Sequence, residues 1–332
     1  MAVAKAPAPT VSDTTGVQRG DQIFGFLLRL AGVIVIVVLV LMVLVLAGKS
    51  LEVFQFSGLS YFTGTIWDSV DGQEQFGTLA FTVGTVVTSI LALLLATPLA
   101  VGAAIFVSEY APRWLGQPIA FIVELLVTIP SVAYGLWGYL VMVPFLDKTL
   151  FPILRGTLGQ LPLIGTFFQD PRGVRVTGES WLAGGIILAI MILPTILSLS
   201  REVISQVPRL QKEGMLALGA TKWEMLSGAI LPFAKGGIVG SMVLGLARAV
   251  GETMAVGMVV GNTTDRILPS LFTPGYTIAS FIANNYSDPG DSPVVRSALV
   301  GLGLVLLIVA TVFNLISRAL VRQVTKMPGG GR

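Results

Sequence analysis

Arg248 and Glu252 are two charged residues in the fifth of six apolar runs of the sequence, at 236–261. In an unbroken helix their spacing places both on one face, about 6 Å apart along the axis. A charge at the bilayer centre costs about 2.5–3.5 kcal/mol, so it normally faces a partner, a cavity or a permeant ion. A guanidinium offers parallel N–H donors, which suits a tetrahedral oxyanion. The pair therefore predicts either a path for an anion or a structural ion pair.

Glu124 is a third charged residue expected inside the membrane, near one end of the third apolar run. Its carboxylate can pair with Arg248, line the same path or extend to the membrane surface. Hydroxyl and amide residues near the same path are Thr128, Ser131, Thr253 and Asn262. Serine and threonine in membrane helices commonly bond to their own backbone, so each of these is weak evidence alone. The predicted path residues are Arg248, Glu252, Thr253 and Glu124.

The sequence has no cysteine and no histidine. This excludes disulfides, thiol nucleophiles and the usual zinc or haem ligands, so no metal site and no catalytic residue is predicted. The sequence also lacks the GxxxxGK[ST] motif that cradles phosphates in many ATPases. Any ATP that drives this protein is therefore expected to bind to another chain.

Composition identifies the elements that must position these residues. The 332-residue chain is 54% hydrophobic and 12% charged, with a mean hydropathy of +0.84, whereas average soluble domains carry about 25% charged residues. Apolar runs of about 20 residues can cross a bilayer as helices. We predict an all-α polytopic membrane protein with six transmembrane helices, at about 26–47, 77–97, 119–144, 181–200, 236–261 and 297–317.

Prolines and glycines mark expected interruptions of these helices. Pro98 is predicted to end the second helix. Pro130, Gly135 and Gly138 predict an interrupted third helix, which is tolerated where neighbouring protein satisfies the freed backbone groups. The following loop, 146–180, is rich in proline and glycine and is predicted to be irregular.

Lysine and arginine are unevenly distributed between the two sides that six spans define. Thirteen of the 21 fall on the side of the termini and seven on the other, and Arg248 lies in the membrane. Since positive residues are enriched in cytoplasmic loops, both termini are predicted to be cytoplasmic. The predicted parts are a disordered tail at 1–20, a first helix with an external loop at 21–75, a helical core at 76–320 that contains a basic cytoplasmic loop at 201–232, and a tail at 321–332.

The basic loop at 201–232 carries its own signals for two short helices. Pro208 suits the start of a helix, because its missing N–H costs nothing in a first turn. Gly219 is placed to end that helix in a left-handed cap. Thr221 and Glu224 predict a capping box that starts a second helix, and Pro232 returns the chain to apolar sequence. Such a bent element suits docking into another protein; a simple link between two spans is the alternative.

This loop resembles a signature in the permeases of bacterial ATP-binding-cassette importers: Glu-Ala-Ala, three residues, Gly, nine residues, Ile, one residue, Leu-Pro. Glu213, Gly219 and the Leu231-Pro232 pair match it, whereas Gly214 and Met215 replace the alanines and the isoleucine comes one step late. In that family the loop is a coupling helix that inserts into a groove of the partner ATPase. The resemblance assigns this role to Glu213, Gly214, Ala217, Gly219, Ala220 and Thr221.

Four longer segments resemble the phosphate-importer permeases of PstC type: 77–112, 124–138, 192–226 and 245–262. The resemblance covers about residues 75–320. It implies a type I, MetI-like permease in the plasma (inner) membrane of a prokaryote that imports inorganic phosphate, with Arg248 and Glu252 as transport residues. The implied partners are a sister PstA-type permease, a PstB-type ATPase dimer that binds ATP and magnesium, and a PstS-type phosphate-binding protein on loops 48–75, 146–180 and 262–293.

In this scheme the chain itself needs no cofactor, binds no nucleic acid and is no enzyme, because ATP is hydrolysed by the separate ATPase. Three other functions stay open. A permease for sulfate or molybdate is not distinguished by Arg248 and Glu252 alone. An ion-driven secondary transporter usually has more spans and an inverted repeat, and neither is found. A scaffold that senses phosphate without moving it is the third.

Overall fold

The computed structural model describes residues 14–70, 72–170, 176–263, 267–287 and 292–325. The chain divides into two compact units, Met1–Lys49 and Ser50–Arg332. The described residues of the first unit form one 36-residue helix, α1 (Thr14–Lys49). The predicted disordered tail at 1–20 is therefore wrong from Thr14 onward, and its remainder lies outside the described residues.

Six helices among the described residues are long and apolar enough to cross a membrane. This confirms the predicted number of spans and the all-α fold class. Several spans are longer than predicted, because apolar helices continue past the hydrophobic runs that identified them. Their bounds are Asp21–Lys49, Leu79–Tyr110, Ser131–Gln160, Trp181–Ser205, Lys222–Val250 and Pro293–Gln323.

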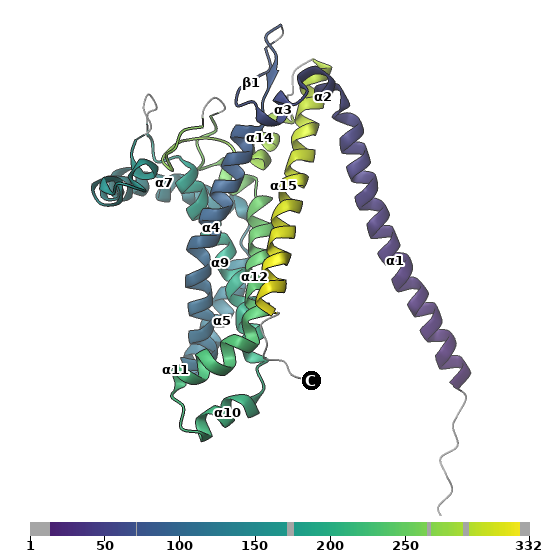
Figure 1. Ribbon diagram of the computed structural model, residues 1–332, viewed down its shortest axis with the longest axis vertical. Coiled ribbons are helices and arrows are strands. Elements are labelled where there is room, and N and C mark those ends of the chain that lie inside the picture. The colour runs from purple at the N-terminus through teal and green to yellow at the C-terminus, as the bar shows by residue number, and fades with distance from the viewer. Residues whose placement is uncertain (1–13, 71, 171–175, 264–266, 288–291, 326–332) are drawn as a thin grey trace, which may run out of the picture. The chain divides into compact units, whose positions relative to one another are not determined.

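Four long helices form the bundle of the second unit (Figure 1): α4 (Leu79–Ile105), α9 (Trp181–Ser205), α12 (Leu231–Val250) and α15 (Pro293–Thr325). The closest partners are α4 and α9, which pack along much of their lengths. Small side chains allow this approach: α4 places a fully buried alanine at every fourth position, at Ala92, Ala96, Ala100 and Ala104. Small residues at this spacing let two helix backbones come close inside a membrane.

The predicted end of the second helix at Pro98 is wrong. Helix α4 contains Pro98 and continues to Ile105, where the π-helical turn η1 (Phe106–Tyr110) follows directly. A proline inside a helix removes one backbone hydrogen bond. The buried alanines on both sides of Pro98 pack against the bundle, and such tertiary contacts hold the helix together despite the lost bond.

The predicted third span, 119–144, straddles two separate helices. Helix α5 (Arg113–Thr128) ends before Ile129, whose ψ of 129° is the extended conformation favoured before a proline. After Pro130 a new helical stretch begins and continues into the predicted irregular loop. Its segments are α6 (Ser131–Trp137), η2 (Gly138–Met142), α7 (Val143–Phe145), η3 (Leu146–Leu150) and α8 (Phe151–Gly156).

Gly135 and Gly138 do not interrupt this stretch. A Cβ added to Gly135 would lie 2.9 Å from the Cα of Ala255, and one added to Gly138 would lie 3.0 Å from a methyl group of Val259. The first contact is shorter than real Cβ atoms show, and the second is tighter than most real contacts. The two glycines therefore serve close packing against the segment that follows α12.

One end of the bundle carries a second, smaller apolar cluster. It is built from α2 (Leu51–Ser57), α3 (Ser60–Thr63), the antiparallel strands β1 (Trp67–Asp68) and β2 (Gln75–Phe76), and α14 (Ile278–Asn285) against α15. The hydroxyl of Tyr61 donates to the carbonyl of Ala298 at 2.7 Å. We call this the hairpin end (Figure 1, top), because β1 and β2 lie there.

Candidate functional site

The loop at 201–232 lies at the end of the bundle opposite the hairpin end (Figure 1). It forms α10 (Arg209–Ala217), α11 (Lys222–Met225) and the π-helical turn η6 (Leu226–Ile230), which continues into α12. Pro208 occupies the position before the first residue of α10, so the predicted helix start is confirmed. We call α10, α11 and the turn between them the coupling loop.

Gly219 ends α10 in the left-handed conformation, with φ of +83°. The N–H of Ala220 donates to the carbonyl of Met215 at 3.1 Å, and the N–H of Gly219 donates to that of Leu216 at 3.0 Å. These two bonds are the pair that defines a Schellman cap. The predicted left-handed cap is confirmed, and it turns the chain sharply before α11.

Thr221 and Glu224 form the predicted capping box at the start of α11. The N–H of Glu224 donates to the Thr221 hydroxyl at 3.2 Å, and the N–H of Thr221 donates to the Glu224 carboxylate at 2.7 Å. Both ends of the turn are therefore fixed by hydrogen bonds between near neighbours in sequence. The bent geometry predicted for this loop is confirmed.

The predicted coupling residues lie on the exposed side of this turn. Glu213, Gly214, Ala217, Gly219 and Thr221 are exposed, and Ala220 is half-buried. Apolar side chains beside them are also exposed: Leu210 at 82%, Leu218 at 87% and Trp223 at 66%. Exposed leucine and tryptophan at the tip of a polar loop are typical of a protein interaction site.

Contacts that sequence reasoning missed attach the coupling loop to the end of α4. Lys212 on α10 forms an ion pair with Glu109 in η1, and the ammonium of Lys222 lies 5.7 Å from the centre of the Tyr110 ring. These pairs are more than a hundred residues apart in sequence. No local pattern connects them, because only the fold brings 106–110 and 209–225 together.

Arg248 and Glu252 do not lie on one continuous helix. Helix α12 ends at Val250, and the next helical turn, α13, covers Met254–Gly257. The predicted common helical face is therefore wrong, because the chain leaves the helix at Gly251. The described ion pairs do not include one between Arg248 and Glu252.

Thr195 on α9 is the contact of Arg248 that the sequence did not suggest. A guanidinium N–H of Arg248 donates to the Thr195 hydroxyl at 3.3 Å. Arg248 is half-buried in the last turn of α12. Most of its five N–H donors are not used by Thr195, which leaves a fork suited to an oxyanion.

Glu252 lies two residues before the next helical turn, α13. Its carboxylate accepts from the N–H of Ala255 at 3.2 Å, which satisfies one free donor at the start of α13. Thr253 is half-buried beside it, and its side chain does not cap α13. Asn262, farther along, has φ of +52° and donates to the carbonyl of Gly257 at 2.7 Å. Arg248 and Glu252 thus stand on the two sides of a helix break.

Glu124 is remote in its contacts from the other predicted path residues. It lies on α5, is 62% exposed and has its carboxylate 3.7 Å from Arg201 near the end of α9. Glu124 therefore does not pair with Arg248, which was one of the three predicted alternatives. Thr128 bonds to the carbonyl of Leu125 in its own helix, as expected for a membrane threonine.

The profile of the family described as "Binding-protein-dependent transport system inner membrane component" matches residues 96–326. The phosphate transport system permease protein PstC of Xylella fastidiosa (strain 9a5c) is 42% identical over 311 residues, covering 94% of this chain and 93% of that protein. PstC of Haemophilus influenzae is 40% identical, covering 93% and 95%. The chain belongs to this family, as a PstC-type permease.

A solved structure also resembles this PstC-type permease. It is the crystal structure of a bacterial alginate ABC transporter in complex with a periplasmic protein bound to an alginate pentasaccharide. The TM-score is 0.59 at 17% identity, with 95% of this chain and 98% of that chain covered. At this identity the likeness concerns the fold alone. It places the PstC-type permease in the type I importer architecture that the sequence predicted.

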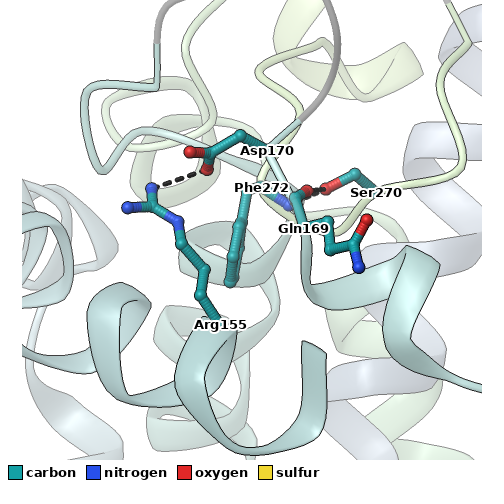
Figure 2. A network of polar contacts seen from close by, with 5 residues as sticks. All are labelled: Arg155, Gln169, Asp170, Ser270 and Phe272. Atoms are coloured by element: carbon teal, nitrogen blue, oxygen red, sulfur yellow. Dashed lines mark hydrogen bonds and ion pairs between the residues drawn. The ribbon is translucent and has the colours of Figure 1, made fainter. Parts of the chain in front are cut away.

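At the hairpin end of the PstC-type permease, two loops are held together by one polar network (Figure 2). Arg155 pairs with Asp170 at 2.6 Å and lies 5.6 Å from the centre of the Phe272 ring. The Ser270 hydroxyl donates to the carbonyl of Gln169 at 2.6 Å. The segments η4 (Leu158–Gln160) and η5 (Gly165–Phe168) lie between Arg155 and Asp170 in the chain. The loops predicted to be external, 146–180 and 262–293, are therefore in contact with each other.

Proposed function

We propose that this chain is the transmembrane permease subunit of an ATP-driven importer of inorganic phosphate and forms half of its translocation path. What carries the proposal is the identity of 42% and 40%, over nearly the whole chain, to proteins named phosphate transport system permease protein PstC. The half-buried Arg248 supports the choice of an oxyanion as substrate, because a guanidinium is a bidentate donor to tetrahedral oxyanions.

In the proposed mechanism, phosphate binds briefly to Arg248 at the end of α12. Thr195 orients the guanidinium before the anion arrives, and the anion takes donors that Thr195 leaves unused. Glu252, across the helix break, places a negative charge near the same site. This weakens anion binding, which a permeation site requires because the ion must leave as well as enter. Tight selection then belongs to an external binding protein.

The coupling loop is proposed to receive the force that closure of the partner ATPase generates. Its exposed Leu210, Leu218 and Trp223 dock into a PstB-type ATPase dimer, which binds ATP with magnesium and hydrolyses it, so this chain is not itself an enzyme. Closure of the ATPase draws the coupling loops of this chain and a sister PstA-type permease together. The spans then open outward, and hydrolysis resets them.

The proposed orientation in the inner membrane follows from these roles. The coupling loop and both termini face the cytoplasm, in agreement with the excess of lysine and arginine on that side. The hairpin end then faces outward and meets a PstS-type phosphate-binding protein. Its two loops, joined by the Ser270–Gln169 hydrogen bond and the Arg155–Phe272 contact, offer that protein a surface.

Transport by the purified complex tests this function. We would purify the chain with its companions from its own membrane, reconstitute them in vesicles with ATP inside or outside, and measure uptake of labelled phosphate. ATP-dependent uptake that excess sulfate or molybdate does not inhibit is the expected result. Inhibition by those anions would instead indicate a broader oxyanion permease, uptake without ATP a secondary transporter, and a complete complex without uptake a sensing scaffold.

A further inference from the structure

The pair of Glu109 and Lys212 is the most deeply buried ion pair between described residues. Its side chains are 11% and 20% exposed, whereas every side chain in the other described pairs is at least 34% exposed. The ammonium of Lys212 donates to the carboxylate of Glu109 at 2.5 Å. Removing one member of a buried pair leaves an uncompensated charge, so the two side chains are held together more firmly than a surface pair.

The two residues come from elements with different tasks. Glu109 belongs to η1, which directly continues the long helix α4. Lys212 belongs to α10 of the coupling loop, 103 residues later. The neighbouring Tyr110 is also in contact with the coupling loop, through the ammonium of Lys222 on α11. Two consecutive residues at the end of α4 thus touch both short helices of the loop.

Helix α10 has few other attachments to the bundle. Lys212 and Met215, three positions apart, are its half-buried residues, and its other residues are exposed. Met215 packs against the large apolar core beside Gly228. Apolar contact is non-directional, whereas a charge-assisted hydrogen bond fixes the distance and direction between two groups. The ion pair therefore determines where α10 sits on the end of α4.

From η1 the contacts continue toward Arg248. Helix α4 packs along α9 through its row of buried alanines, and α9 carries Thr195, which accepts from Arg248. A contiguous set of contacts does not by itself demonstrate coupling, which needs a measured interaction between the two sites. The first contact in this set, between α10 and the end of α4, is an ion pair, so it can be tested by changing the two charges.

We propose that Glu109 and Lys212 are positioning residues for ATP-driven transport, and that their ion pair passes the displacement of α10 to α4. This inference rests on the proposed function, in which the coupling loop receives force from the ATPase. Neither residue touches phosphate or ATP. Their loss should therefore leave nucleotide hydrolysis running while less phosphate moves for each ATP consumed.

The test uses Glu109→Gln, Lys212→Gln and the charge swap Glu109→Lys with Lys212→Glu, each in the complete reconstituted complex. We would measure recovery of the complex, ATP hydrolysis and labelled phosphate uptake. The ratio of phosphate moved to ATP hydrolysed should fall about tenfold in each single variant and return to within about threefold of wild type in the swap, because the swap restores an opposite pair. Glu202→Gln is the matched control: Glu202 is exposed at the end of α9, and its variant should behave as wild type.

Three outcomes would overturn the inference. The first is an unchanged ratio in both single variants. The second is a fall in uptake that only follows a fall in recovered complex, which would make the pair a structural contact. The third is a charge swap no better than the single variants. Absence of ATP-dependent uptake by the wild-type complex would overturn the proposed function and this inference together, whereas the other outcomes leave the proposed function intact.

Discussion

The coupling loop and the break after Arg248 are both places where a long helix gives way to irregular chain, but different forces hold them. In the coupling loop, the hydrogen bonds of the turn join residues at most five apart, and most of the loop is exposed. At the break, Arg248 bonds to a residue 53 positions away. The following turn, α13, contains Ala255 and Val256 with no exposed surface.

This difference suggests how each region fails. A locally capped turn keeps its shape when its surroundings move, so it can be displaced as one piece. A break held by distant contacts changes shape when those contacts change. Substitutions in the coupling loop should therefore disturb coupling to the ATPase, and substitutions at the break should disturb handling of the anion.

Arg248→Gln should have the largest effect. Loss of two charge-assisted hydrogen bonds to the anion, at about 1.5 kcal/mol each, corresponds to a fall in phosphate uptake of about 100-fold. Recovery of the complex should not change. Arg318→Gln is the matched control, because Arg318 is an exposed helical arginine bonded to Asn314 in its own helix. If Arg248→Gln prevents assembly, the arginine is a structural residue and not a transport residue.

Gly219→Val should uncouple ATP hydrolysis from uptake. A β-branched residue at φ of +83° costs about 1–3 kcal/mol, so the turn should change shape and the uptake per ATP should fall about tenfold. Gly240→Ala is the control, since Gly240 is helical and no atom lies within 4 Å of its added Cβ. Normal coupling in the Gly219 variant would argue against a role for the rigid turn.

Glu252→Gln separates the two tasks of this carboxylate. Glutamine keeps an oxygen that can accept from Ala255, so α13 should keep its start while the charge is lost. We expect tighter phosphate binding and about fivefold slower uptake, because release becomes slower. Glu252→Ala removes the cap as well and serves for comparison. Wild-type uptake by the glutamine variant, with a loss only in the alanine variant, would reduce Glu252 to a capping residue.

Thr195→Val should have the smallest effect. It keeps the shape of the side chain and removes the acceptor of Arg248, which costs about 1 kcal/mol or about a fivefold loss of uptake at most. Thr311→Val is the control, because the hydroxyl of Thr311 donates to the carbonyl of Leu307 in its own helix and is exposed. Equal uptake by both variants would mean that Thr195 does not orient the arginine.

The same contrast explains which features could be predicted from sequence. Pro208, Gly219 and the Thr221–Glu224 pair specify backbone hydrogen bonds over a few residues, so the geometry of the coupling loop follows from local rules. Helix number also follows, because apolar length is a property of a segment by itself.

Features that depend on distant packing were predicted less well. Pro98 was expected to end a helix that buried alanines hold together, and Gly135 and Gly138 were expected to interrupt a helical stretch that continues through them, whereas the predicted interruption at Pro130 is present. At the break, the apolar run continues to 261 although the helix stops at Val250. The sequence signal for this helix end was Gly251 followed by Glu252, whose carboxylate can accept from a free N–H at a helix start. Glycine costs about 1 kcal/mol inside a helix. The Glu109–Lys212 pair had no sequence signal.

Helix α9 contains a proline directly before the threonine that holds Arg248. Pro194 has no N–H, so the carbonyl of Ile190 one turn earlier lacks its helical donor, and the ladder of backbone bonds has a missing rung there. Helices bend most readily at such a position. A small bend of α9 at Pro194 would move the Thr195 hydroxyl and so change the orientation of the Arg248 guanidinium and its affinity for the anion. Helix α12 would not have to move.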